Sequence, residues 1–129
     1  MKEIIEEIRS EIEQNKLDSL SKFSHLTIRQ IEIYLLWRKM REYNIKNIKE
    51  IKTAYGDKIS IWTLYKILRQ FRENVKKTIF DLIILDILNV VSLLDISSLR
   101  QLREHITSML ISEEQISKLL NSALHKRKL

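Results

Sequence analysis

The stretch IKEIKTAYGDKISIWTLYKILRQF, residues 48–71, decides the fold that the sequence predicts. Its first part, residues 48–55, places apolar side chains at helical spacing and is followed by Gly56, the only glycine in the chain. A glycine directly after a helix commonly takes the left-handed conformation that closes it. A second helical pattern begins at Ser60. The stretch therefore predicts two short helices joined by a tight turn.

The first helix of this pair is predicted from its start signal and from one apolar face. Asn47 and Glu50 have the spacing of a capping box, in which two side chains satisfy free backbone N–H groups. Ile48, Ile51 and Tyr55 then fall on one side of a helix. We therefore expect a helix over residues 47–55.

The second helix is predicted to have two different sides. Ser60 stands where an N-cap hydroxyl accepts from the first turn. The apolar stripe consists of Leu64, Ile67, Leu68, Phe71 and Val75. Rings, hydroxyls and cations lie mostly off this stripe: Trp62, Thr63, Tyr65, Lys66, Arg69 and Arg72. A helix N-terminus favours phosphate, and long cationic side chains reach base edges in a major groove. We therefore predict that this exposed face, with Lys58, Ser60 and Ile61 before it, binds DNA.

The same segment resembles a known family. Residues 59–68 follow the order apolar, Ser, x, x, Thr, apolar, x, basic, x, Leu, with matches at Ile59, Ser60, Thr63, Leu64, Lys66 and Leu68. This order resembles the recognition helix of tri-helical and winged-helix regulators of bacteria and archaea, which carry a helix-turn-helix motif. The resemblance covers roughly residues 28–75. It implies phosphate contacts for Ser60 and Thr63, and a phosphate or base contact for Lys66.

Two features depart from the family pattern. Asp57 and Lys58 lengthen the turn between the two helices. No clear Gly-turned β-hairpin follows Phe71, where a wing would stand in a winged helix.

The distribution of charge favours nucleic acid as a partner. The chain carries a net charge of +6. Residues 28–77 hold 13 Lys or Arg against 5 Asp or Glu, whereas residues 1–27 hold 4 against 6 and residues 78–129 hold 6 against 6. The positive charge thus coincides with the predicted motif, as expected for a module that binds double-stranded DNA.

Composition predicts an all-α fold of about six helices. The chain of 129 residues is 44% apolar, with no proline, one glycine and no cysteine, which leaves few residues for the tight turns of a β fold. We expect one domain over residues 1–129, with the DNA-binding module at 28–77 and a helical dimerisation region at 78–129. The acidic, periodic N-terminus does not resemble a signal peptide, so we expect a cytoplasmic protein.

Helices are also predicted on both sides of the motif. Ile4, Ile5, Ile8 and Ile12 form a stripe over residues 2–15 that packs on another helix, either in the same chain or in a partner. Thr27 and Gln30 have capping-box spacing at the start of a helix over residues 28–43. Residues 98–124 predict an α-hairpin.

The most apolar run of the chain covers residues 78–96. A membrane span is one alternative, but Asp81 and Asp86 would place carboxylates inside the hydrocarbon, which is costly. We therefore predict a homodimer interface and no membrane partner; the other alternative is the central helix of a monomer. The predicted interface residues are Ile79, Ile83, Ile84, Ile87, Leu88, Val91 and Leu94.

No arrangement of residues predicts an enzyme. The three histidines are scattered, cysteine is absent, and there is no glycine-rich phosphate loop. We expect no metal, no cofactor and no small-molecule substrate. The sequence favours a dimeric helix-turn-helix transcriptional regulator, or a plasmid or viral partition or replication factor. The alternative is an all-α structural subunit of a nucleoprotein assembly or virion that coats nucleic acid without reading its sequence.

Overall fold

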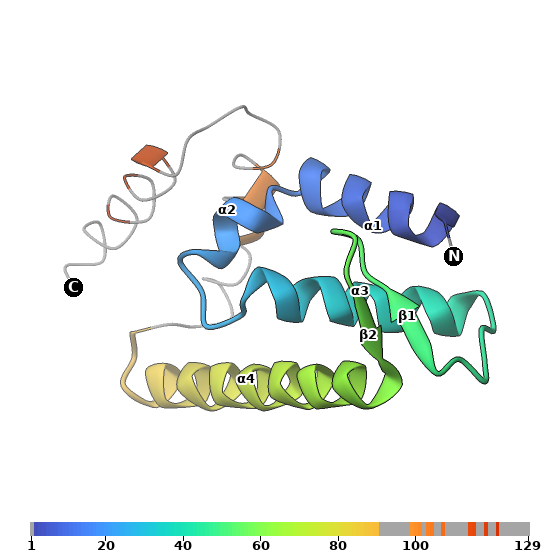
Figure 1. Cartoon of the computed structure of the whole chain (residues 1–129). Coiled ribbons are helices and arrows are strands. Elements are labelled where there is room, and N and C mark those ends of the chain that lie inside the picture. The colour runs from blue at the N-terminus through green and yellow to red at the C-terminus, as the bar shows by residue number, and fades with distance from the viewer. Residues whose placement is uncertain are drawn as a thin grey trace. The chain divides into compact units, whose positions relative to one another are not determined.

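The computed structural model describes residues 2–90 and, beyond them, residues 99–101, 103, 104, 107, 114, 115, 118 and 121 (Figure 1). The chain divides into two compact units, Met1–Lys77 and Thr78–Leu129. Helix predominates, which confirms the predicted fold class, and a small two-stranded sheet is added. In chain order the elements are α1 (Lys2–Gln14), α2 (Leu17–Ser21), α3 (Ile28–Glu42), β1 (Glu50–Lys52), β2 (Lys58–Ser60) and α4 (Ile61–Ile87).

Helix α3 is the centre of the first unit. Figure 1 shows it between α1 and the first half of α4, and none of the residues 28–40 is fully exposed. On one side it packs against α1, whose predicted stripe is buried: Ile4, Ile5, Ile8 and Ile12. Burial of each isoleucine contributes about 1.5–3 kcal/mol. This stripe is therefore occupied within its own chain.

On its other side α3 packs against α4. Leu64 and Leu68 of α4 are each only 1% exposed. The Phe71 ring stacks on the Tyr34 ring of α3, with 4.7 Å between the ring centroids. Farther along, Asn74 Nδ2 donates to Gln30 Oε1 at 3.0 Å. The order of these contacts makes α4 antiparallel to α3.

The predicted capping box at the start of α3 is confirmed. The backbone N–H of Gln30 donates to Thr27 Oγ1 at 3.1 Å, and the backbone N–H of Thr27 donates to Gln30 Oε1 at 3.4 Å. Two free N–H groups of the first turn are thereby satisfied. The segment before it contains the short helix α2.

The helix predicted over residues 47–55 is wrong, because this segment enters a β-hairpin. Strands β1 and β2 pair antiparallel, with Ile51 opposite Ile59. Burial alternates along residues 50–53, where Ile51 and Thr53 are buried and Glu50 and Lys52 are exposed. This is the period of a strand, and β-branched side chains favour it. Asn47, predicted as an N-cap, has a φ of 62° in the left-handed region instead.

Gly56 belongs to the hairpin turn and does not close a helix. Its φ of +99° lies in the region where other residues are strained. Its backbone N–H donates to the Thr53 carbonyl at 3.2 Å, and the Thr53 N–H donates to the Asp57 carbonyl at 2.8 Å. The lone glycine thus allows the chain to reverse direction between β1 and β2.

Helix α4 is continuous where the sequence predicted two helices. It begins at Ile61, directly after β2, and runs to Ile87. No helix in the described part of the chain combines the length and the apolar character that a membrane span needs. The predicted interface residues Val91 and Leu94, and most of the α-hairpin predicted over residues 98–124, lie outside the described residues.

Candidate nucleic-acid interface

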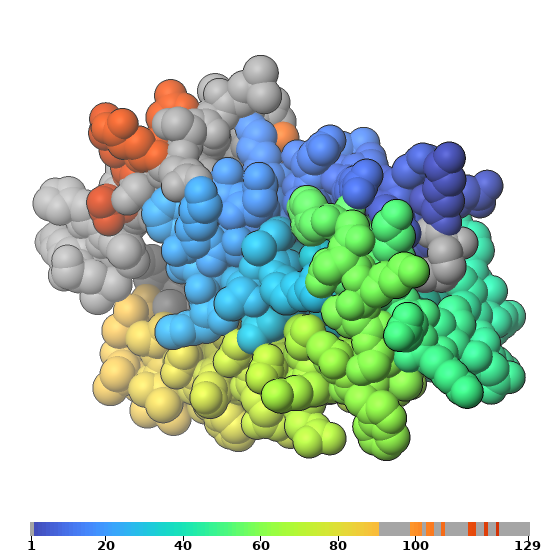
Figure 2. Space-filling model, in the orientation of Figure 1, coloured from blue at the N-terminus to red at the C-terminus, as the bar shows by residue number. Residues whose placement is uncertain are grey.

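The start of α4 is fixed to the hairpin. The backbone N–H of Thr63 donates to Ser60 Oγ at 3.2 Å, which confirms Ser60 as the N-cap. The two hydroxyl oxygens of Ser60 and Thr63 lie 3.0 Å apart. The Ile61 N–H donates to the Lys49 carbonyl at 2.9 Å and closes the hairpin at the same point. Figure 2 shows the hairpin and the first half of α4 side by side at the surface.

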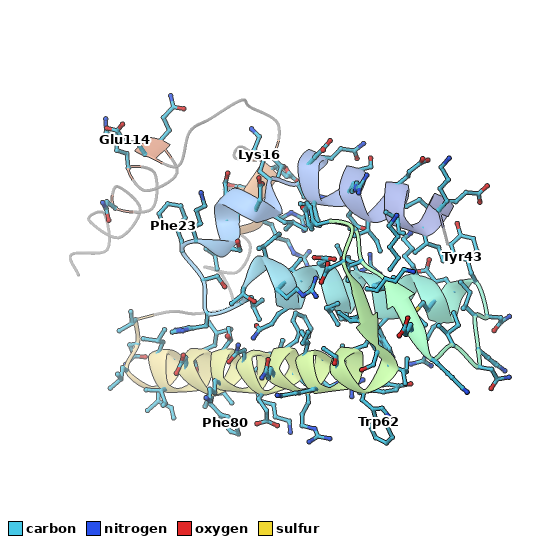
Figure 3. The ribbon with its side chains drawn as sticks, in the orientation of Figure 1. Lys16, Phe23, Tyr43, Trp62, Phe80 and Glu114 are labelled. Atoms are coloured by element: carbon cyan, nitrogen blue, oxygen red, sulfur yellow. The ribbon has the colours of Figure 1, made fainter. Side chains whose placement is uncertain are left out.

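One side of α4 forms an exposed face of rings and cations, which we call the α4 face. Trp62 is 82% exposed and Tyr65 is 52% exposed, and Figure 3 shows Trp62 pointing away from the ribbon. The α4 face lines a surface hollow of about 490 Å³. Its members are Trp62, Tyr65, Lys66, Arg69 and Arg72. The sequence predicted which side of this helix is exposed, and the structure confirms that side.

Three other predicted site residues do not belong to the α4 face, and they differ from one another in exposure. Ile61 is half-buried and packs against the hydrophobic core, so its prediction as an exposed contact is wrong. A step of one residue around a helix turns the side chain by about 100°, which separates Ile61 from its exposed neighbour Trp62. Thr63 is exposed, whereas Ser60 is half-buried and engaged in the cap.

The hairpin adds cations next to the α4 face. Lys58 of β2 was predicted as a site residue, and it is exposed directly opposite Lys52 of β1. Like charges opposite each other in a sheet destabilise it, and an anion bound between them would relieve this repulsion. Lys52 was not predicted, because its place beside Lys58 depends on a strand register that the sequence alone did not indicate.

Two basic side chains of α3, Arg38 and Lys39, differ from those of the interface in their partners. Arg38 Nη2 lies 2.8 Å from Glu11 Oε1, and Lys39 Nζ lies 3.4 Å from Glu7 Oε2. In contrast, no described carboxylate lies within 4.0 Å of the cations of the hairpin and the α4 face: Lys52, Lys58, Lys66, Arg69 and Arg72. These five cations therefore carry positive charge without a described carboxylate partner.

A polar cluster holds the hairpin turn on α3. Glu32 is buried, and its Oε1 accepts the backbone N–H of Ala54 at 3.0 Å. Arg29 Nη1 lies 3.6 Å from the other carboxylate oxygen of Glu32. Burial raises the pKa of Glu32, although these two contacts oppose the shift. The Nε–H of Arg9 donates to the Ala54 carbonyl, so α1 also contributes to the position of the turn.

Asp57 forms the other half of this cluster. Arg29 Nη2 donates to Asp57 Oδ2 at 2.6 Å, and the Thr53 hydroxyl donates to Asp57 Oδ1. These hydrogen bonds, that of Arg29 first, lower the pKa of Asp57 from 3.8 to about 2. The turn is thus tied to α3 by an ionised carboxylate, and Lys58 follows that carboxylate directly in the chain.

Acid is expected to remove the contribution of Asp57 to stability. Because its pKa is lower in the folded state, the stabilisation is complete above 3.8 and is lost as the pH falls toward about 2. Asp57→Asn should therefore be less stable than wild type at pH 7, and urea unfolding curves of the two proteins should converge as the pH falls through this window. The matched control is Glu50→Gln, which removes the same charge from an exposed position of the hairpin. A pH-independent deficit in Asp57→Asn would contradict the role of the ionised carboxylate.

Comparison of the chain with protein-family models, with curated protein sequences and with solved structures found no match in any of the three. The function must therefore be argued from the chemistry of the site. Among the residues that the structure describes, no group of three or more His, Asp or Glu side chains is placed to hold a metal ion. The side chains of the candidate interface are aromatic rings, hydroxyls and cations without described carboxylate partners.

Proposed function

We propose that this chain is a DNA-binding protein that inserts the α4 face into the major groove of double-stranded DNA. The observation that carries the proposal is the α4 face itself, where two exposed rings and three cations without described carboxylate partners share one side of a helix. A major groove about 12 Å wide admits an α-helix.

The chemistry of the α4 face suits both parts of a DNA duplex. Lys66 and Arg69 are donors for phosphates, and Arg69 also has the fork geometry that binds the O6 and N7 atoms of guanine. Trp62 and Tyr65 present apolar ring surface of the kind that contacts thymine methyl groups. The face therefore combines groups that position the helix with groups that distinguish bases.

The hairpin is suited to the DNA backbone beside the groove. Its β2 strand ends at Ser60, and α4 begins at the next residue, so Lys58 lies three residues before the inserted helix. Lys52 is its cross-strand neighbour. In this proposal, both lysines bind phosphates, and the bound phosphates reduce the repulsion between the two lysines.

The second half of α4 supports the proposal of a homodimer. The predicted interface residues within the described part are all exposed, at 49–71%: Ile79, Ile83, Ile84, Ile87 and Leu88. Apolar surface of this kind is commonly covered by another protein surface. Two α4 faces on one duplex would bind more tightly than one face alone. This arrangement is typical of a transcriptional regulator, and it also suits a partition or replication factor.

The resemblance to helix-turn-helix regulators stays a prediction, and it rests on α4. That helix carries the matching residues of the recognition helix, from Ser60 to Leu68. The hairpin, however, takes the place of the other helix of that motif. We therefore base the proposed DNA contact on the α4 face and the hairpin.

One observation favours the second function, a subunit that coats nucleic acid without reading it. Lys46, Lys49 and Lys52 are exposed in and before the hairpin, so basic surface extends beyond the α4 face. Phosphate contacts made by such lysines carry no sequence information.

Selection from a random-sequence duplex library separates the two functions. A regulator should shift a fraction of the library in a gel, and sequencing of that fraction should reveal a shared motif. Trp62→Ala should then relax the motif more than it lowers non-specific affinity, because Trp62 is exposed and is expected to contact bases. Bound DNA without enrichment would support the coating subunit, and the absence of any shift would overturn the proposed function.

A further inference from the structure

Two arginines from different helices share one tryptophan ring. The Arg41 guanidinium carbon lies 4.9 Å from the centroid of the Trp37 ring, and that of Arg72 lies 5.3 Å from it. Arg41 and Trp37 belong to α3, one helical turn apart, whereas Arg72 belongs to α4. Packing of α4 on α3 therefore brings two guanidinium groups together on one half-buried indole.

This pair lacks the carboxylates that accompany a comparable arginine nearby. Arg38, also on α3, lies over the Tyr34 ring at 5.6 Å and has Glu11 at 2.8 Å and Glu42 at 3.9 Å. No carboxylate lies within 4.0 Å of Arg41 or Arg72 in the part of the chain that the structure describes. Attraction to the indole holds the two cations, but it does not neutralise their charge.

The pair is continuous with the α4 face. Arg72 belongs to both, since it lines the hollow with Lys66 and Arg69 as well as contacting Trp37. Arg41 is exposed near the C-terminal end of α3. The positive surface therefore extends from α4 onto α3, which was not among the predicted site elements.

We propose that Arg41 and Arg72, positioned by Trp37, form a phosphate-binding pair that holds the DNA backbone at the edge of the groove occupied by α4. This inference rests on the proposed function and adds a contact to it. Guanidinium groups bind phosphate oxygens with paired hydrogen bonds. A ring contact restricts the motion of the guanidinium before binding, so less conformational entropy is lost when the phosphate is bound.

The test is the salt dependence of binding to duplex DNA. Arg41→Gln should reduce the slope of log association constant against log salt by about one, and should lower affinity about fivefold at roughly 0.15 M salt. Its melting temperature should match wild type, because Arg41 is exposed. Arg41→Lys retains the charge and should recover most of the slope.

Arg38→Gln is the matched control, since it removes a ring-bound arginine of the same helix whose charge is already paired with Glu11. It should leave the slope unchanged. A wild-type slope in Arg41→Gln, or an equal loss in Arg38→Gln, would overturn the phosphate-binding pair while leaving the proposed function intact. If wild type does not bind duplex DNA, the proposed function fails and the pair fails with it.

Discussion

Replacing Lys66 and Arg69 together with alanine is expected to weaken duplex binding on the order of 10- to 100-fold at about 0.15 M salt. Both side chains are exposed, line the same hollow and have no described carboxylate partner. Loss of two phosphate contacts should also reduce the salt slope by about two. Fluorescence anisotropy of a labelled duplex measures both quantities. Circular dichroism should show unchanged helix content, because neither residue contributes to the core.

A second double variant separates this site from a general effect of net charge. The double variant Lys39→Ala, Lys76→Ala also removes two positive charges. In wild type, however, Lys39 is paired with Glu7 at 3.4 Å and Lys76 with Glu73 at 3.3 Å. We expect it to bind nearly as tightly as wild type. Equal losses in the two double variants would assign the effect to overall charge and would remove the α4 face as the binding site.

Replacing Ile83 and Ile87 together with lysine is expected to convert a dimer into monomers. These side chains are 49% and 71% exposed, and charges at the same positions would oppose burial against a second copy. Light scattering should show the mass of one chain where wild type shows two. Binding to duplex DNA should weaken although the α4 face is unaltered, because one duplex would no longer hold two linked faces.

Two further results would contradict the proposed dimer or its role in DNA binding. A wild-type chain that remains monomeric at tens of micromolar would exclude this interface at working concentrations. Unchanged DNA affinity in a monomeric Ile83→Lys, Ile87→Lys variant would retain the interface but reject its role in binding.

The sequence was sufficient for the buried and exposed sides of the first half of α4, because the evidence there is local. Leu64 and Leu68 are four residues apart, as are Trp62 and Lys66, and the two pairs are offset by two residues, which places them on different sides of a helix. The structure buries the first pair and exposes the second. The Thr27 cap is local in the same way, since its partner is three residues distant. Such signals require only the geometry of one helix.

The hairpin could not be predicted in this way, because its position depends on contacts between distant segments. Ile48 and Ile51 fit the pattern of a helix or of a strand. The strand is favoured in part by Glu32, which accepts the Ala54 N–H from a buried position on α3. Arg29 similarly holds Asp57 across the turn. Neither pairing is visible in the local pattern of residues 47–60.

The candidate site was predicted incompletely for a related reason. Lys52 joins it through the β1–β2 register, and Arg41 through packing of α3 on α4. Both are contacts between elements. Ile61 was expected to be exposed beside Trp62, but the structure packs it against the core, since adjacent residues of a helix point to different faces.

The proposed contact of the α4 face and the hairpin is with the phosphates and bases of double-stranded DNA. Its most direct test is the association constant of the wild-type chain for duplex DNA, measured between about 50 and 200 mM salt. We predict a linear fall of log association constant with log salt, with a slope of about three or steeper, since at least Lys58, Lys66 and Arg69 would each displace a counterion. Absence of binding at about 50 mM salt, or an affinity that does not change with salt, would contradict the proposed contact.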